Sequence, residues 1–172
     1  MEKLINKVDK LLLGFLMLLM ILMVLDVSWQ VITRYLAPKP SPFTEELASY
    51  FMMWIGVLGG AYAFRQKAHL GIDVLTQRFK GKTRIYMDMF IYIMVILFAV
   101  LVLIWGGLRL VFIQLYLNQL SAALRIPVGY VYLVLPLTGI LLVLYSLDFI
   151  FRLKSDETEI SETEKQILAG MD

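Results

Sequence analysis

The chain has 172 residues, of which 60% are apolar and 17% are charged. Soluble proteins average roughly 45–50% apolar and about 25% charged residues, so a water-soluble fold of this length is excluded. The net charge of +2 is too small for a nucleic-acid binder, and we expect no nucleic acid among the partners. The absence of cysteine and the single histidine, His69, argue against thiol chemistry and two-imidazole sites. We therefore expect no enzyme activity, no cofactor and no bound metal.

Four apolar runs dominate the chain, and each reaches the ~20 residues that a helix needs to cross a bilayer core. They cover about residues 11–32, 43–64, 85–116 and 128–151. The first run is longer than the roughly 7–15 apolar residues of a signal peptide, so it is expected to stay as an anchor. The sequence predicts an all-α membrane protein with one four-helix domain, residues 1–151. Residues 152–172 form a polar, acidic tail, expected to be cytoplasmic and either disordered or loosely helical.

The basic residues are distributed unevenly between the segments that connect these runs. Most of the 16 lysines and arginines lie before the first run, between the second and third, or after the fourth. Short segments rich in Lys and Arg resist translocation, so both termini are predicted to be cytoplasmic. The exceptions, on the outer side, are Arg34, Lys39, Arg109 and Arg125.

The connecting segments have distinct characters. Residues 37–42 form a proline-rich outer loop, and Pro42 suits the first position of the second helix. The link between the second and third runs is amphipathic, which predicts a short helix lying along the membrane interface. Its basic side chains, together with those flanking it, are candidates for lipid headgroup contact: Arg65, Lys67, Arg78, Lys80, Lys82 and Arg84.

The third and fourth runs depart from simple straight spans. The third is too long for a hydrocarbon core of ~30 Å, so it must tilt or protrude. In the fourth, Pro136 with Gly139 one turn later predicts a kink.

A polar stripe marks the outer part of the first run, where Asp26, Gln30 and Arg34 share one helix face. Ionisable groups within a span cost about 2.5–3.5 kcal/mol each on the insertion scale, so a partner or a role is expected. The stripe fits an interfacial helix end, a packed contact with a second protein, or an ion relay.

Two carboxylates, Glu45 and Glu46, open the second run. Negative charge in a first helical turn is stabilised by the helix dipole, which is one explanation for the pair. The other is that they face Arg34 or the cations of a partner and fix how this helix docks.

A glycine-rich stretch follows in the same run, with Gly56 and Gly60 four residues apart. Small residues at this spacing let helix backbones approach closely in lipid. The seam is expected to pack either on another span of this chain or on a foreign subunit.

Several blocks in fixed order resemble the small membrane subunit of tripartite ATP-independent periplasmic (TRAP) transporters, the DctQ-like Q component. The blocks that carry this resemblance are Gln30–Tyr35, Glu45–Ala48, Trp54, Gly59–Ala61, His69–Asp73 and Ser121–Pro136.

The resemblance implies a non-catalytic scaffold in the bacterial inner membrane. It implies a large membrane subunit, M, that holds the substrate and sodium sites, and a periplasmic binding protein, P, that delivers an organic anion such as a sialic acid or a C4-dicarboxylate. Candidate subunit-interface residues are Asp26, Gln30, Arg34, Glu45, Glu46, Gly56 and Gly60. Candidate contacts with the periplasmic partner are Lys39, Asn118 and Arg125.

Two other classes of protein remain as alternatives. One is an autonomous, dimeric carrier or channel that uses Asp26 as its coupling carboxylate. The other is a membrane enzyme or redox anchor, which the single histidine and the lack of cysteine oppose.

Overall fold

The computed structural model describes residues 2–36, 42–66 and 82–169, and every regular element in them is helical. The helices are α1 (Glu2–Leu36), α2 (Pro42–Arg65), α4 (Lys82–Phe98), the π-helix η1 (Ala99–Gly106), α5 (Gly107–Tyr116), α6 (Val128–Val131) and α7 (Val134–Ala169). Four helical stretches are long and apolar enough to cross a membrane: Ile5–Leu36, Pro42–Arg65, Ile85–Tyr116 and Val128–Leu153. The predicted all-α fold with four such helices is confirmed.

The helices run further than the apolar runs alone indicate. α1 begins at Glu2 because Ile5 and Leu12, in its first turns, are buried against the rest of the fold. α2 begins at Pro42, as expected. The N–H of the first residue in a helix has no partner within the helix, so proline, which lacks this group, suits the position. α7 continues into the tail as far as Ala169, so the described part of the tail is helical. The expected interfacial helix lies outside the described residues.

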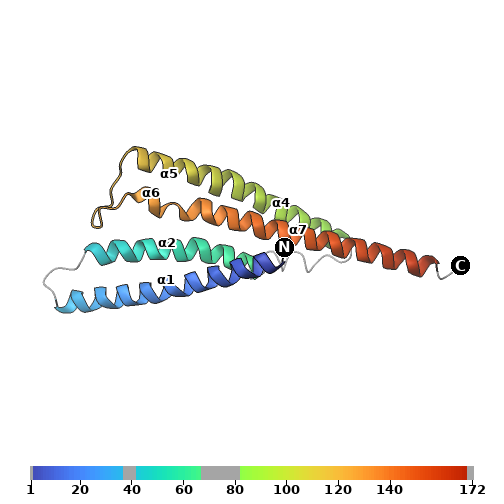
Figure 1. Cartoon of the computed structure of the whole chain (residues 1–172), viewed down its shortest axis with the longest axis horizontal. Helices are drawn as coiled ribbons and strands as arrows, with labels where there is room; N and C mark the ends of the chain where they lie inside the picture. Colours follow the sequence, from blue (N-terminus) through green and yellow to red (C-terminus); the bar gives the residue numbers. More distant parts are fainter. Residues whose placement is uncertain (1, 37–41, 67–81, 170–172) are drawn as a thin grey trace.

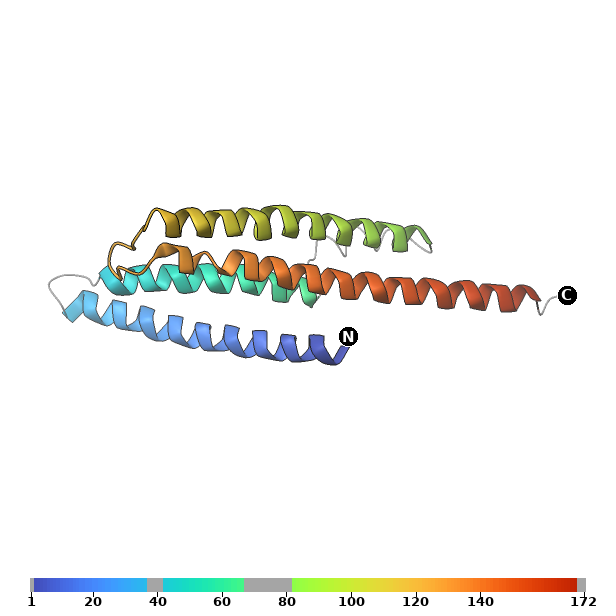
Figure 2. The same cartoon turned by 45° about the horizontal axis from the view of Figure 1, so that its top comes forward.

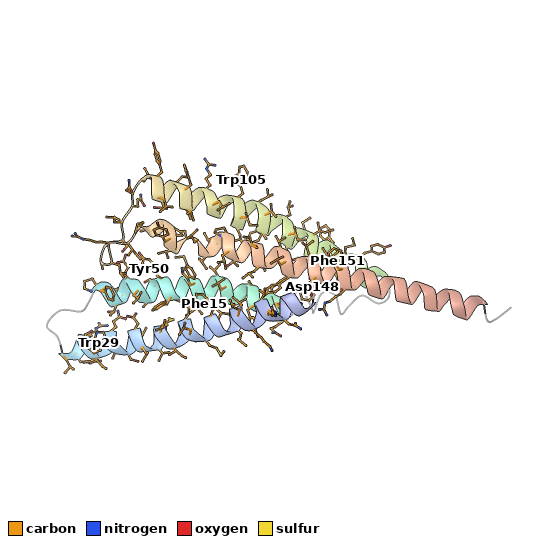
Figure 3. All side chains as sticks on the ribbon, in the orientation of Figure 1. Phe15, Trp29, Tyr50, Trp105, Asp148 and Phe151 are labelled. Carbon is orange, nitrogen blue, oxygen red and sulfur yellow. The ribbon has the colours of Figure 1, made fainter. Side chains whose placement is uncertain are left out.

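The four spans lie side by side in a row (Figures 1 and 2). α1 packs on α2, α2 packs on α7, and α7 packs on the third span, which α4, η1 and α5 form together. The fourth span is central, with 44% of its most apolar window buried, whereas only 6% of the third span's window is buried. Most of the third span therefore faces outward, and Figure 3 shows Trp105 on its outer face.

The third span contacts the fourth very closely at glycines. A Cβ at Gly139 would lie 2.7 Å from Cγ1 of Ile104 and 3.2 Å from the carbonyl oxygen of Ala99, both in η1. A Cβ at Gly107 would lie 2.9 Å from Cδ of Pro136. The π-helical segment thus coincides with one of the places where the two backbones approach closely.

Replacing Gly139 with Ala is expected to destabilise the fold by about 1–3 kcal/mol, because the added methyl group overlaps η1 and forces the two spans apart. The matched control is Gly14→Ala, since a Cβ at Gly14 meets no atom within 4 Å. Thermal unfolding in detergent should show a lower Tm for Gly139→Ala and no decrease in Tm for Gly14→Ala. Equal Tm values would contradict the close contact.

The fourth span is interrupted between α6 and α7, in the turn that precedes Pro136, where the sequence predicted a kink. Proline has no N–H, and the N–H of Leu135 donates to the carbonyl oxygen of Tyr132 at 3.1 Å. The carbonyl of Val131 is then free to accept a bond from the indole Nε1 of Trp54 in α2, at 3.0 Å. The ring of Trp54 also packs edge-on against Phe15 of α1, with centroids 6.1 Å apart. This side chain therefore links three spans.

Trp54→Phe keeps an aromatic ring but removes the indole donor to Val131. We expect a loss of about 1 kcal/mol, the usual net value of one hydrogen bond. Trp29→Phe serves as the control because Trp29 is 59% exposed. Chemical denaturation of the two variants should separate them, and an unchanged midpoint for Trp54→Phe would contradict the role of the bond.

Candidate functional site

An ionic cluster joins three helices at the end of the row where α1 begins. We call it the inner ionic cluster and define it as Asp9, Arg65, Asp148 and Arg152. Arg65 lies 3.1 Å (Nε) from Oδ2 of Asp9 and 2.9 Å (Nη1) from Oδ2 of Asp148. Nε of Arg152, one helical turn further along α7, lies 3.0 Å from the same oxygen of Asp148. Figure 3 shows Asp148 where α7 passes α1.

Two aromatic rings also lie close to the guanidinium of Arg65. Its side chain is 12% exposed, and Cζ lies 5.7 Å from the ring centre of Tyr145 and 5.3 Å from that of Phe149. Aromatic faces attract a cation at this range. The expected headgroup contact at Arg65 is thus corrected: two carboxylates and two rings hold its charge inside the bundle. Sequence reasoning missed Asp9, whose place two residues before the first apolar run was the available signal.

At the opposite end of the row, residues 117–127 connect the third span to α6, and we call them the outer lasso. α5 ends in a Schellman motif: Asn118 takes a left-handed φ of 48°, its N–H donates to Leu115 at 3.1 Å, and the N–H of Gln119 donates to Gln114 at 3.2 Å. Two bonds then close the lasso: the N–H of Ser121 donates to Ile126 at 2.9 Å, and that of Val128 to Gln119 at 3.0 Å. The lasso is therefore fixed by its own backbone.

The carboxylate of Glu46, from α2, binds inside this lasso. Three successive backbone N–H groups donate to it, from Ala122 at 3.1 Å, Ala123 at 2.7 Å and Leu124 at 2.9 Å. The hydroxyl of Tyr50 donates to the same carboxylate at 2.7 Å. Consecutive N–H groups form an anion-binding concavity, and here the anion belongs to the protein itself. Glu46 thereby ties the start of the second span to the loop before the fourth.

The remaining outer candidates lie apart from this carboxylate. Glu45, Arg34, Asn118 and Arg125 are exposed, and Arg125 has a left-handed φ of 53°. Asn118 has a structural role as the left-handed residue that ends α5. Of the two explanations open for the glutamate pair, a contact with Arg34 does not apply to Glu46, since its carboxylate accepts hydrogen bonds from backbone N–H groups of this chain.

The polar stripe of α1 is only partly enclosed. Asp26 and Gln30 are half-buried, and the hydroxyl of Thr33 donates to the carbonyl oxygen of Gln30 at 3.0 Å. One carboxylate oxygen of Asp26 is buried without a hydrogen-bond partner among the described residues. The same described part contains no group of three or more His, Cys, Asp or Glu side chains that could hold a metal.

The glycine seam of α2 does not pack on another span. A Cβ at Gly56, Gly59 or Gly60 would meet no atom within 4 Å. Gly60 also borders a groove of about 270 Å³ between α2 and the third span, with α7 at its base. The lining is apolar except for one hydroxyl: Val57, Gly60, Ala61, Phe64, Val95, Phe98, Leu103, Thr138 and Leu142. The sequence left two partners open for the seam, another span of this chain or a foreign subunit. The described spans of this chain do not cover it.

The other headgroup candidates are placed only in part. Lys82 and Arg84 lie in the first turn of α4, which begins at Lys82. Lys67, Arg78 and Lys80 fall outside the described residues, as does Lys39 among the outer candidates.

Comparison with known proteins agrees with this architecture. The model of the DctQ component of tripartite ATP-independent periplasmic transporters matches residues 20–155. The sialic acid TRAP transporter small permease protein SiaQ of Vibrio cholerae is 26% identical over 140 residues, which cover 78% of this chain and 79% of that protein. A putative TRAP transporter small permease protein of Haemophilus influenzae is 26% identical over 120 residues, covering 70% and 73%.

A third relative is a much longer protein. The isethionate TRAP transporter permease protein DctMQ of Oleidesulfovibrio alaskensis is 26% identical over 130 residues, which are 72% of this chain but 20% of that protein. The resemblance noted in the sequence is confirmed, since the family match covers most of the chain and includes the second, third and fourth spans. This multi-pass membrane protein therefore belongs to the DctQ family, the small membrane components of TRAP transporters.

Proposed function

We propose that the chain is the non-catalytic small subunit of a TRAP-type secondary transporter and acts as a scaffold for a large membrane subunit. The transporter takes up an organic anion of the sialic acid or C4-dicarboxylate type, coupled to sodium. A periplasmic binding protein delivers the anion. Both termini lie in the cytoplasm, so the outer lasso faces the periplasm.

The observation that carries this proposal is the arrangement of the spans in a single row (Figure 2). A carrier builds its site near the bilayer midplane from broken helices and polar groups that surround a substrate. The groove beside α2 is instead lined by apolar side chains and one threonine, with no charged group. A row of helices offers two broad apolar faces, which suits a protein that supports a larger one.

Different surfaces are assigned to the different partners. The open glycine seam at Gly56 and Gly60 is the proposed contact with the large subunit, with the half-buried Asp26 and Gln30 as further candidates. Arg34 and Glu45 belong to the outer surface, and Lys39 is retained as a candidate contact with the periplasmic partner on its sequence alone. Lys82 and Arg84 remain candidates for headgroups of the inner leaflet, because basic side chains at the cytoplasmic interface attract anionic lipids.

Co-purification tests the assignment. The chain, tagged and expressed with the large TRAP subunit of the same transporter, is expected to retain that subunit through affinity and size-exclusion steps. Uptake of the organic anion by cells should require both subunits. Recovery of the chain alone, with uptake unaffected by its deletion, would contradict the proposed function.

A further inference from the structure

The outer half of the third span carries an exposed arginine among aromatic rings. We propose that this surface binds a phospholipid with a net negative charge, of the phosphatidylglycerol type, in the outer leaflet. Arg109 pairs with the lipid phosphate, and the rings of Trp105, Phe112 and Tyr116 line the site. We call these four residues the aromatic face. The choice of leaflet rests on the proposed orientation of the chain, whereas the site itself does not depend on the proposed role in transport.

The four side chains of the aromatic face lie on one side of the span. Arg109, Phe112 and Tyr116 have the i, i+3, i+7 spacing of a single helix face in α5. Trp105 lies one turn earlier, on the outer side of the span (Figure 3). Trp105 is 72% exposed, Phe112 69% and Tyr116 76%. The rings of Phe112 and Tyr116 stack, with centroids 6.2 Å apart. The face is therefore open to its surroundings over about three helical turns.

The depth of Arg109 in the bilayer follows from the length of the span. Ile85–Tyr116 has 32 residues, whereas a hydrocarbon core of ~30 Å takes about 20. With the surplus divided between the two ends, the outer edge of the core falls at about residue 110. Arg109 then lies at this edge, where the flexible stem of an arginine brings its guanidinium to the phosphates. Trp105 lies just inside the edge and Tyr116 beyond it, and both residue types are enriched at membrane interfaces.

The charge of Arg109 requires an anion from outside the chain. Arg109 is exposed and forms no ion pair with another residue that the structure describes. A cation at the edge of the hydrocarbon is costly without a partner. The sequence has no acidic residue between Asp88 and Asp148, so neither the rest of α5 nor the outer lasso supplies a carboxylate.

The shape of the aromatic face favours a lipid over a helix of another protein. Helices that pack together in lipid meet at small residues, as the open seam of α2 provides. The aromatic face instead presents large rings, between which flexible acyl chains can lie. A phosphodiester accepts hydrogen bonds from the guanidinium of Arg109 and from the hydroxyl of Tyr116. A zwitterionic headgroup carries its own cation, so a lipid with a net negative charge is the better partner for a lone arginine.

The test uses the full chain in phosphatidylcholine nanodiscs, with Trp105 as the reporter. Phospholipids with brominated acyl chains quench the fluorescence of a tryptophan that they contact. A Trp105→Phe variant serves as the blank, so the difference between the two signals reports Trp105 alone. At equal low mole fractions, brominated phosphatidylglycerol should quench this signal about fivefold more effectively than brominated phosphatidylcholine, the preference expected from one basic side chain beside an anionic lipid.

Substitutions locate the preference on the aromatic face. Arg109→Gln should abolish it, and Arg109→Lys should keep part of it. The control is Arg34→Gln, which removes the same charge from an exposed arginine of α1, at the other edge of the row, and should leave the preference unchanged. Tyr116→Phe should reduce the preference because the hydroxyl donor is lost. The same change at Tyr86, which is 62% exposed near the inner end of the span, should not.

Equal quenching by the two brominated lipids in the unmodified chain would overturn the site. An equal loss of preference in Arg34→Gln and Arg109→Gln would overturn it in favour of a general effect of net charge. The complex with the large subunit provides a further check, since the aromatic face should stay open to lipid there. Loss of lipid quenching at Trp105 in that complex would overturn the lipid site in favour of a subunit contact. The proposed function is tested separately, by co-purification of the two subunits, and would stand in each of these cases.

Discussion

Replacing Arg65 with Met is expected to destabilise the protein by about 3–5 kcal/mol, because it leaves the carboxylates of Asp9 and Asp148 close together inside the bundle without their shared cation. The methionine keeps the apolar stem that packs near Tyr145 and Phe149. Loss of the charge, and not of side-chain volume, is therefore what the variant measures. Denaturant titration in a fixed detergent gives the free energy of unfolding directly.

Arg152→Met is the matched control. It removes the same charge from the same carboxylate of Asp148, but its side chain is 47% exposed, so the expected loss is below about 1 kcal/mol. Adding Asp9→Asn and Asp148→Asn to Arg65→Met should restore part of the stability, because no buried carboxylate then remains without its cation. Equal losses for the two single arginine variants would contradict the central place of Arg65.

The second large effect is expected on assembly. Gly60→Leu should sharply reduce the amount of large subunit that co-purifies, because the leucine covers the seam at Gly56 and fills the adjoining groove. The fold itself should tolerate the change, since a Cβ at this position meets no atom within 4 Å. Yield and Tm of the isolated chain should therefore stay at wild-type values.

Gly14→Leu is the control for this variant, because Gly14 also has open space around it but lies on α1, away from the groove. It should leave the amount of large subunit unchanged. Full retention of the large subunit by Gly60→Leu would remove the seam from the interface. A fall in Tm of the isolated chain would show that the seam serves the fold of this chain alone.

The positions of the spans could be predicted from the sequence because the bilayer imposes a minimum apolar length on each helix. The interruption near Pro136 was predictable for a covalent reason, since proline lacks the N–H that a continuous helix needs. Both features depend on residues close together in the chain. The length of α1 was less predictable, because its first turns are helical through contacts of Ile5 and Leu12 with other segments.

The row of helices and the π-helical segment could not be predicted in this way. In lipid, an apolar face that packs on a helix and one that faces acyl chains have similar compositions, so hydropathy does not reveal neighbours. The π-helix η1 lies directly against Gly139, on a different span, and a contact of this kind leaves no local pattern in the sequence.

The sequence identified some of the polar residues that make contacts, but not their partners. An arginine at the end of a span has the same local pattern whether it faces headgroups or carboxylates, and Arg65 pairs with Asp9 and Asp148, both distant in sequence. Glu46 was recognised as a candidate, but its partners are backbone N–H groups, which leave no signature in the side chains around them. The structure thus separates Glu46 from Glu45, which the sequence presented as a pair.

Reconstitution into liposomes tests the central claim, that this chain is a scaffold and does not conduct solute, most directly. Purified chain alone should give no sodium-dependent flux of the organic anion, whereas liposomes that also contain the large subunit, supplied with the binding protein, should accumulate it. Flux through the chain alone, especially flux abolished by Asp26→Asn, would contradict the scaffold and establish an autonomous carrier.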